Sequence, residues 1–166
     1  MHNMKAFEAS LKPHLKLKDY PFAVDFSAHI PIYDGDQLRT LDAHNKAQVQ
    51  AEWAQCLQHG AGVFVVRQLY DQVAAVDAAT EVFYQLLHEQ NKNPQTNGDH
   101  FAAQGVNGRI WNCLEKLAVT QPQAFIDYYK NPLLAQVCES WLGPDYQLTS
   151  QVNLVYPGGA AQQPHR

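Results

Sequence analysis

The side chains in this sequence that are best suited to chemistry lie in residues 145–166, which read DYQLTSQVNLVYPGGAAQQPHR. From residue 146 to residue 156 apolar and polar residues alternate, and this period of two predicts a strand with two unlike faces. The apolar face carries Leu148, Val152, Leu154 and Tyr156, whereas the polar face carries Gln147, Thr149, Gln151 and Asn153. Such a polar face is normally turned to water, but in a barrel with a ligand cavity its amides can bind the carboxylates of a ligand.

A turn and a histidine follow this strand. The Pro-Gly-Gly sequence at residues 157–159 breaks the alternation, because proline cannot donate to a ladder and glycine supplies turn geometry. A second strand is therefore expected to begin near residues 163–165. The imidazole of His165 would stand at the mouth of that strand, where a lone histidine is either incidental or a metal ligand.

The strand with Gln-x-Asn, the Pro-Gly turn and the run ending Gln-x-Pro-His-Arg resemble the entry to the double-stranded β-helix of the phytanoyl-CoA dioxygenase family. The segment HGAGVFVVRQLYD at residues 59–71, expected between two helices, is similar to the N-terminal part of the same family. The resemblance covers roughly residues 60–166 and is strongest over residues 145–166. It implies an iron(II)/2-oxoglutarate-dependent dioxygenase that uses molecular oxygen to hydroxylate a small organic substrate while 2-oxoglutarate becomes succinate.

The resemblance also implies roles for single residues. In the family an H-x-D motif and a distant second histidine hold the iron, and His165 matches the first ligand with Arg166, next to the substrate, in the middle position. None of the eight histidines has an acidic residue two positions later. We therefore expect the iron site to be incomplete in these 166 residues and the chain as given to be inactive. Gln151 and Asn153, with Thr149 on the same face, correspond to positions beside 2-oxoglutarate.

Arg109 and Trp111 are a second pair of candidate residues. They follow the polar segment 91–108, which is long enough to be a functional loop or lid. Both suit the mouth of a substrate site, and both also suit ordinary surface packing beside a solvated charge. Spacings typical of serine hydrolases, zinc proteases and P-loops are absent, so no residue is assigned as a catalytic acid, base or nucleophile.

The helices and strands expected along the chain indicate an α+β fold in a single domain, residues 1–166. Prolines at positions 13, 21 and 31 favour an extended segment over residues 1–40. Residues 41–144 are predicted to form a helix-rich flank with one or two strands. The resemblance implies that this flank packs on the first strands of a jelly roll, which begin at residue 145 and form an incomplete barrel. Apolar periodicity and capping residues predict helices at 41–59, 71–90, 122–130 and 132–142, a buried strand at 62–66, and a strand before a helix within 109–117.

The composition limits the classes of molecule that this chain is expected to bind. A formal net charge of −4 and a pI near 6.0 give no basic stripe, which argues against nucleic acid or an anionic membrane surface as the main partner. Cys56, Cys113 and Cys138 have neither disulfide nor zinc spacing, so they are expected to be reduced thiols in a cytoplasmic protein. Two alternatives remain open on the residues alone: a metal-free, cupin-like ligand-binding module, and a helical interaction module formed by residues 41–142.

Overall fold

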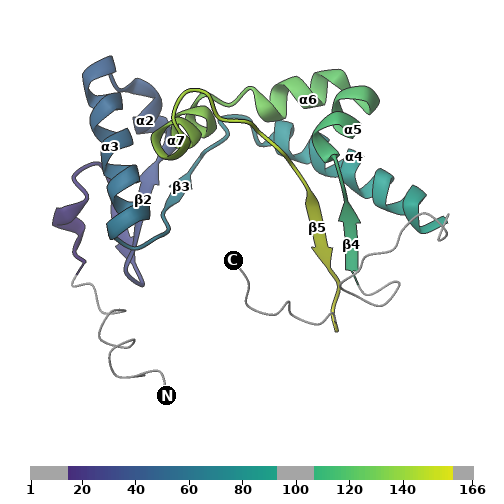
Figure 1. Ribbon diagram of the computed structural model, residues 1–166, viewed down its shortest axis with the longest axis horizontal. Coiled ribbons are helices and arrows are strands. Elements are labelled where there is room, and N and C mark those ends of the chain that lie inside the picture. Colours follow the sequence, from purple (N-terminus) through teal and green to yellow (C-terminus); the bar gives the residue numbers. More distant parts are fainter. Residues whose placement is uncertain (1–14, 93–106, 159–166) are drawn as a thin grey trace. The chain divides into compact units, whose positions relative to one another are not determined.

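The computed structural model describes residues 15–92 and 107–158 (Figure 1). This part of the chain has a mixed α+β fold with six α-helices, α2 to α7, a short 3₁₀ helix, η1, and two small open sheets. The described residues separate into two compact units, one formed by 15–71 and 131–146 and the other by 72–92, 107–130 and 147–158. The α+β class is confirmed, and no closed barrel is present among the described residues. None of the described helices is long and apolar enough to cross a membrane.

The first unit begins with η1 (Leu17–Asp19) and contains a three-stranded sheet in the order β1-β2-β3. β1 (Asp25–Ser27) and β2 (Ile30–Asp34) form an antiparallel hairpin, whose two turn residues, Ala28 and His29, both have positive φ, as a tight hairpin turn requires. β3 (Val65–Arg67) then pairs with β2 in parallel. The segment expected to be extended thus supplies two of the three strands.

Three helices cover the core of the first unit, namely α2 (Gly35–Thr40), α3 (Ala43–His59) and α7 (Pro132–Leu142). The buried core residues are Tyr33, Leu38, Val49, Trp53 and Leu133. The Trp53 indole stacks on the Phe64 ring, with 5.5 Å between centroids and 10° between planes, and Tyr33 meets both rings edge-on. These aromatic contacts join α3 to β2 and to the segment leading into β3.

Asn131 joins two distant parts of the first unit. It is only 8% exposed, and its Oδ1 accepts hydrogen bonds from the backbone N–H groups of Leu133 at 3.0 Å and Leu134 at 3.2 Å. Its Nδ2 donates to the carbonyl of Leu69 at 2.9 Å. The residue therefore caps α7, as the sequence predicts, and also anchors that helix to the segment that follows β3.

Glu52 is a half-buried carboxyl group on α3. The Tyr33 hydroxyl donates to Glu52 Oε1 at 2.8 Å, and the backbone N–H of Phe22 donates to Oε2 at 3.3 Å. Burial raises the pKa of Glu52 above its ordinary value, despite the opposing effect of both hydrogen bonds. This carboxyl group ties the chain before β1 to the central strand of the sheet.

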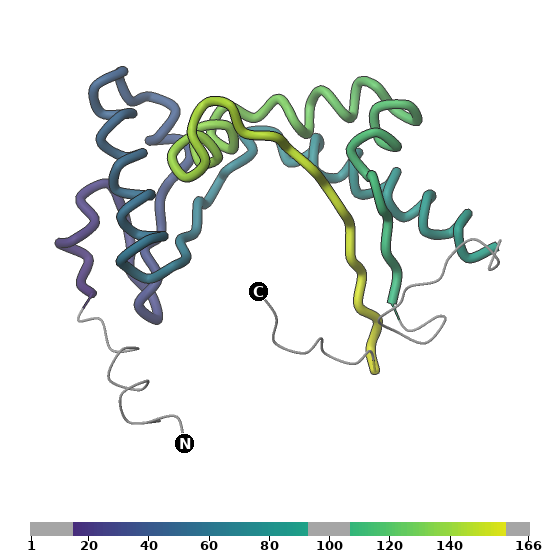
Figure 2. The backbone as a smooth tube through the Cα atoms, in the orientation of Figure 1, coloured from purple at the N-terminus to yellow at the C-terminus, as the bar shows by residue number. Residues whose placement is uncertain are grey.

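The second unit packs three helices, α4 (Val73–Lys92), α5 (Cys113–Thr120) and α6 (Pro122–Tyr129), around its own core. The buried core residues are Ala79, Val82, Phe83, Leu87, Ile110, Cys113, Leu117 and Ala124. A two-stranded antiparallel sheet, β4 (Asn107–Ile110) and β5 (Val152–Val155), belongs to the same unit. The backbone trace in Figure 2 shows that these strands run side by side although more than forty residues separate them in sequence.

Most predicted helices are confirmed to within a few residues, and strand before helix is the observed order at 107–120. Three details of the prediction are wrong. The helix expected at 71–90 begins at Val73 and ends at Lys92. β3 is not fully buried, because it lies at a sheet edge and Val65 is 43% exposed. The last strand is shorter than predicted, and Leu148, which was assigned to its apolar face, lies before β5 and is 41% exposed.

Replacing Asn131 tests its double role. We expect Asn131→Ala to lower the free energy of unfolding by about 1–2 kcal/mol, the usual cost of losing a helix cap. Asn131→Asp keeps an oxygen that can accept from Leu133 and Leu134 but loses the donor to Leu69, so it should cost less. Urea unfolding followed by tryptophan fluorescence measures both. If both variants lost the same free energy of unfolding, the hydrogen bond to Leu69, and not the helix cap, would account for the stabilisation by Asn131.

The raised pKa of Glu52 predicts a pH dependence of stability. Its folded-state pKa lies above the ordinary 4.5, so its contribution is fully present below pH 4.5 and is lost as pH rises through the folded-state value. Glu52→Gln does not titrate. The free energy of unfolding of the wild type minus that of Glu52→Gln should therefore fall as pH rises from 4.5, in urea titrations at several pH values. A difference that grows with pH would contradict this assignment.

Candidate functional site

The sheet formed by β4 and β5 has two unlike faces. Ile110 pairs with Val152, and Gly108 pairs with Leu154. Ile110 is fully buried, and Val152 and Leu154 pack against the helical core of the second unit. A Cβ atom on Gly108 would lie 2.9 Å from a methyl carbon of Leu87, so glycine lets β4 approach α4 closely. This face is fixed by packing.

The opposite face carries the pairs Arg109–Asn153 and Asn107–Val155, so it is polar except for Val155, which is 60% exposed. Arg109 Nε donates to Asn153 Oδ1 at 2.6 Å. The guanidinium carbon lies 5.1 Å from the centroid of the Trp111 ring, a cation–π distance. Trp111 is itself 48% exposed. The structure thus brings together three residues that the sequence had singled out in two separate stretches.

A hydrogen-bonded group of three side chains fixes the chain just before β5. The Ser150 carbonyl accepts from the backbone N–H of Cys113 at 3.2 Å, and Ser150 Oγ and Cys113 Sγ lie 3.0 Å apart in a second hydrogen bond. The Tyr129 hydroxyl donates to Ser150 Oγ at 2.7 Å. Burial raises the pKa of Tyr129 from 10.0 to about 12, so its hydroxyl group remains a donor well into the alkaline range.

Sequence reasoning missed this group, although one signal for it existed. Ser150 shares its parity with Leu148, Val152 and Leu154, so it is a polar residue in the apolar row of the predicted strand. Cys113 was interpreted only as a reduced thiol. It is free, as expected, and it is also buried and a hydrogen-bonding partner of Ser150.

The structure does not show the other predicted site residues in a cluster with Arg109 and Asn153. Thr149 and Gln151 are exposed and lie just before β5. His165 and Arg166 lie outside the described residues. Within residues 15–92 and 107–158, no group of three His, Cys, Asp or Glu side chains is placed to hold a metal ion. The described part therefore does not supply an iron site.

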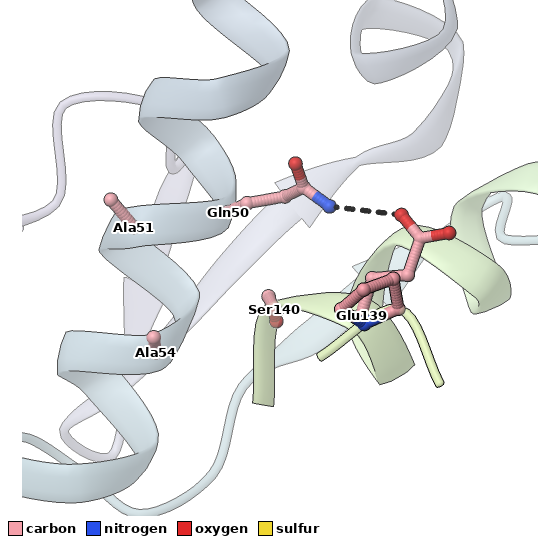
Figure 3. Close-up of a pocket in the computed structure, with 6 residues that line it drawn as sticks. Gln50, Ala51, Ala54, Glu139 and Ser140 are labelled. Carbon is pink, nitrogen blue, oxygen red and sulfur yellow. Dashed lines mark hydrogen bonds between the residues drawn. The ribbon is translucent and has the colours of Figure 1, made fainter. Parts of the chain in front are cut away.

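An open pocket of about 330 Å³ lies in the first unit, and none of the predicted site residues lines it. Its lining comes from α3 and from the end of α7: Gln50, Ala51, Ala54, Glu139, Ser140 and Pro144. Figure 3 shows the Gln50 side chain reaching from α3 toward Glu139, and Gln50 Nε2 donates to Glu139 Oε2 at 3.5 Å and to the Gln136 carbonyl at 3.2 Å. One carboxylate among amide, hydroxyl and apolar groups suggests no reaction, so we assign none.

Comparisons with protein-family models, with curated proteins and with solved structures found no match for this chain.

Ser150 provides a test of the group that fixes β5. Ser150→Ala and Tyr129→Phe should each lower the free energy of unfolding by about 1 kcal/mol, the typical net worth of one such hydrogen bond. Because both remove the same bond, the double variant should lose less than the sum of the two. Urea unfolding measures all three. Ser140→Ala is the matched control, since its hydroxyl bonds only within α7, and it should cost little. A double variant whose loss of unfolding free energy equals the sum of the two single losses would contradict the hydrogen bond between Ser150 and Tyr129.

Proposed function

We propose that this chain is part of an iron(II)/2-oxoglutarate-dependent dioxygenase of the phytanoyl-CoA dioxygenase type, which hydroxylates a small organic substrate with molecular oxygen. The observation that carries the proposal is the two-faced sheet of β4 and β5. Its apolar face rests on a helical core, and its polar face presents an amide and a guanidinium group in register. A helical flank beneath the first strands of a jelly roll would have this construction.

In this proposal the polar face becomes the inner wall of the barrel. Gln151 and Asn153, with Thr149, contribute amide and hydroxyl groups to the binding of 2-oxoglutarate, and Arg109 and Trp111 lie beside the substrate. The role of the helical core is to hold Val152 and Leu154, because a strand whose alternate residues are anchored presents the intervening residues in fixed directions. Amides held in this way bind a ligand without first having to be ordered.

The metal site of the proposal lies on His165, outside the described residues, with Arg166 beside it. The aspartate and the second histidine that complete the ligand set are not present in this sequence. We therefore derive no step through iron and assign to the described residues only binding and positioning. A cytoplasmic location is part of the proposal, and the three free cysteines, which suit a reducing compartment, support it.

The coding sequence on the 3′ side of codon 166 tests the ligand requirement directly. We expect codon 167 to encode aspartate and a histidine codon to follow later in the same reading frame. A stop codon or a non-acidic residue at 167 would remove the iron site and with it the oxygenase. Metal-free ligand binding by the same polar face would then be the better account.

Metal binding by the 166-residue chain itself gives a quantitative prediction. If His165 alone binds manganese(II) with a dissociation constant of ~1 mM, then ~1 mM metal stabilises the fold by about 0.4 kcal/mol. The melting temperature should therefore rise by only about 1–2 °C in a thermal melt, with or without 2-oxoglutarate.

A complete ligand set at ~1,000 times its dissociation constant would instead contribute about 4 kcal/mol. A rise above ~6 °C that His165→Ala abolishes would show that these residues assemble a whole site by themselves, and the ligand assignment would be wrong. His44→Ala is the matched control, because it removes an exposed imidazole from α3.

A further inference from the structure

We propose that the open pocket between α3 and α7 binds a primary ammonium group carried on a short alkyl chain, with the Glu139 carboxylate as its counter-ion. The pocket lies within the first unit, and its volume of about 330 Å³ is at the lower end of the range for small-molecule sites, about 300–1,000 Å³. The ligand is either a free amine or the side chain of a lysine on a partner protein. The inference is separate from the proposed function, because binding here needs neither iron nor 2-oxoglutarate.

The first argument is the hydrogen bonding of the side chains that line the pocket. Gln50 Nε2 donates to the Gln136 carbonyl at 3.2 Å and to Glu139 Oε2 at 3.5 Å, which uses both of its hydrogens (Figure 3). The Ser140 hydroxyl donates to the Val137 carbonyl at 2.7 Å within α7. The remaining lining residues have apolar side chains, and an ionised carboxylate only accepts. The lining side chains therefore offer acceptors to a ligand, and they suit a ligand that brings donors.

The second argument is the charge of Glu139. This exposed residue lies in the last turn of α7, where the helix dipole disfavours an anion, and that turn holds no basic residue. Glu139 forms no ion pair with any other residue that the structure describes, and the hydrogen bond that its side chain accepts comes from the neutral Gln50 amide. The fold itself therefore does not neutralise this negative charge, and a cationic ligand would.

A buried acceptor on the same face of α7 supports a donor-rich ligand. Gln136 lies three residues before Glu139 and four before Ser140, so the three side chains share one face of the helix. Gln136 Oε1 is buried and has no hydrogen-bond partner among the described residues. This face of α7 therefore has more acceptors than donors. An ammonium group has three donors and no acceptor, which corrects that imbalance.

The third argument concerns the body of the ligand. The methyl groups of Ala51 and Ala54, both on α3, and the Pro144 ring give the pocket apolar surface beside the carboxylate. A methylene chain can cover that surface while its ammonium group meets Glu139. A bare metal ion fits less well, because no group of three His, Cys, Asp or Glu side chains in the described part of the chain is placed to hold one.

Titration of the 166-residue chain with butylammonium tests the site. The side-chain amide signals of Gln50 are followed by nuclear magnetic resonance at constant ionic strength and neutral pH, where a primary amine is protonated. Butanol, which has the same chain without the charge, and potassium ion are the control ligands. We expect saturable shifts with butylammonium, weaker binding of butanol, and no saturable shift with potassium. Butylammonium shifts that do not saturate, or equal affinity for butanol, would overturn the inference.

Variants separate this pocket from general charge. Glu139→Gln should weaken butylammonium binding about threefold to tenfold, since a neutral amide replaces the carboxylate. Glu89→Gln is the matched control: it removes an exposed carboxylate from the last turn of α4 and should change binding less than about twofold. Ala54→Leu fills part of the pocket without changing its charge and should also weaken binding. Glu139→Gln, at an exposed position, remains decisive if the leucine variant fails to fold, and equal losses in both glutamine variants would contradict the site.

The stability of the ligand-free chain gives an independent readout. Because the helix dipole disfavours an anion at Glu139, Glu139→Gln should raise the melting temperature by about 1–3 °C. A lower melting temperature would mean that the carboxylate stabilises α7, and the charge argument would be wrong, and the inference with it.

A second ligand identifies the source of the ammonium group. Lysine blocked by an acetyl group and a methylamide carries the same alkylammonium chain as a lysine within a protein. Tighter binding of blocked lysine than of butylammonium supports a lysine on a partner protein, and the reverse supports a free amine. Failure of these titrations is distinct from failure of the oxygenase, because codon 167 decides the iron site and the titrations decide only the ammonium site.

Discussion

The register between β4 and β5 is the constraint on which the candidate site depends. Side chains along a strand alternate between faces, so a slip of one residue would turn Asn153 into the helical core and Val152 into solvent. Two features of β4 oppose that slip. Gly108 is the position where α4 approaches too closely for a side chain, and Ile110 fills a buried position two residues later. Packing on one face therefore determines which chemical groups the other face presents.

The parts of the fold that were predictable are those with local causes. Asn131 and Pro132 specify the start of α7 through a cap and a fixed backbone angle, and the structure has both where the sequence predicts them. The unlike faces of β5 follow from a period of two and were likewise predictable at Val152, Asn153 and Leu154. In each case the cause lies within a few residues of its effect.

The parts that sequence reasoning missed have causes that are distant in the chain. Residues 62–66 look like a buried strand by composition, but exposure depends on neighbours, and β3 has only β2 beside it. Pro31 correctly excludes a helix, yet it lies in the central strand of its sheet, where proline is unusual. Ser150 interrupts the apolar row of its strand because Tyr129 and Cys113 provide partners. Pairing of this kind is not visible in a local pattern.

The bond between Asn131 and the Leu69 carbonyl has a consequence for the order of folding. The two residues are 62 positions apart, and Leu133, the second residue of α7, is part of the core around Trp53. During synthesis at roughly 5–20 residues per second, the first unit must therefore wait about 3–12 s after Leu69 is made before α7 can cover that core. Until then the face of α3 that packs on α7 is uncovered on the nascent chain, and transiently exposed apolar surface of this kind favours aggregation.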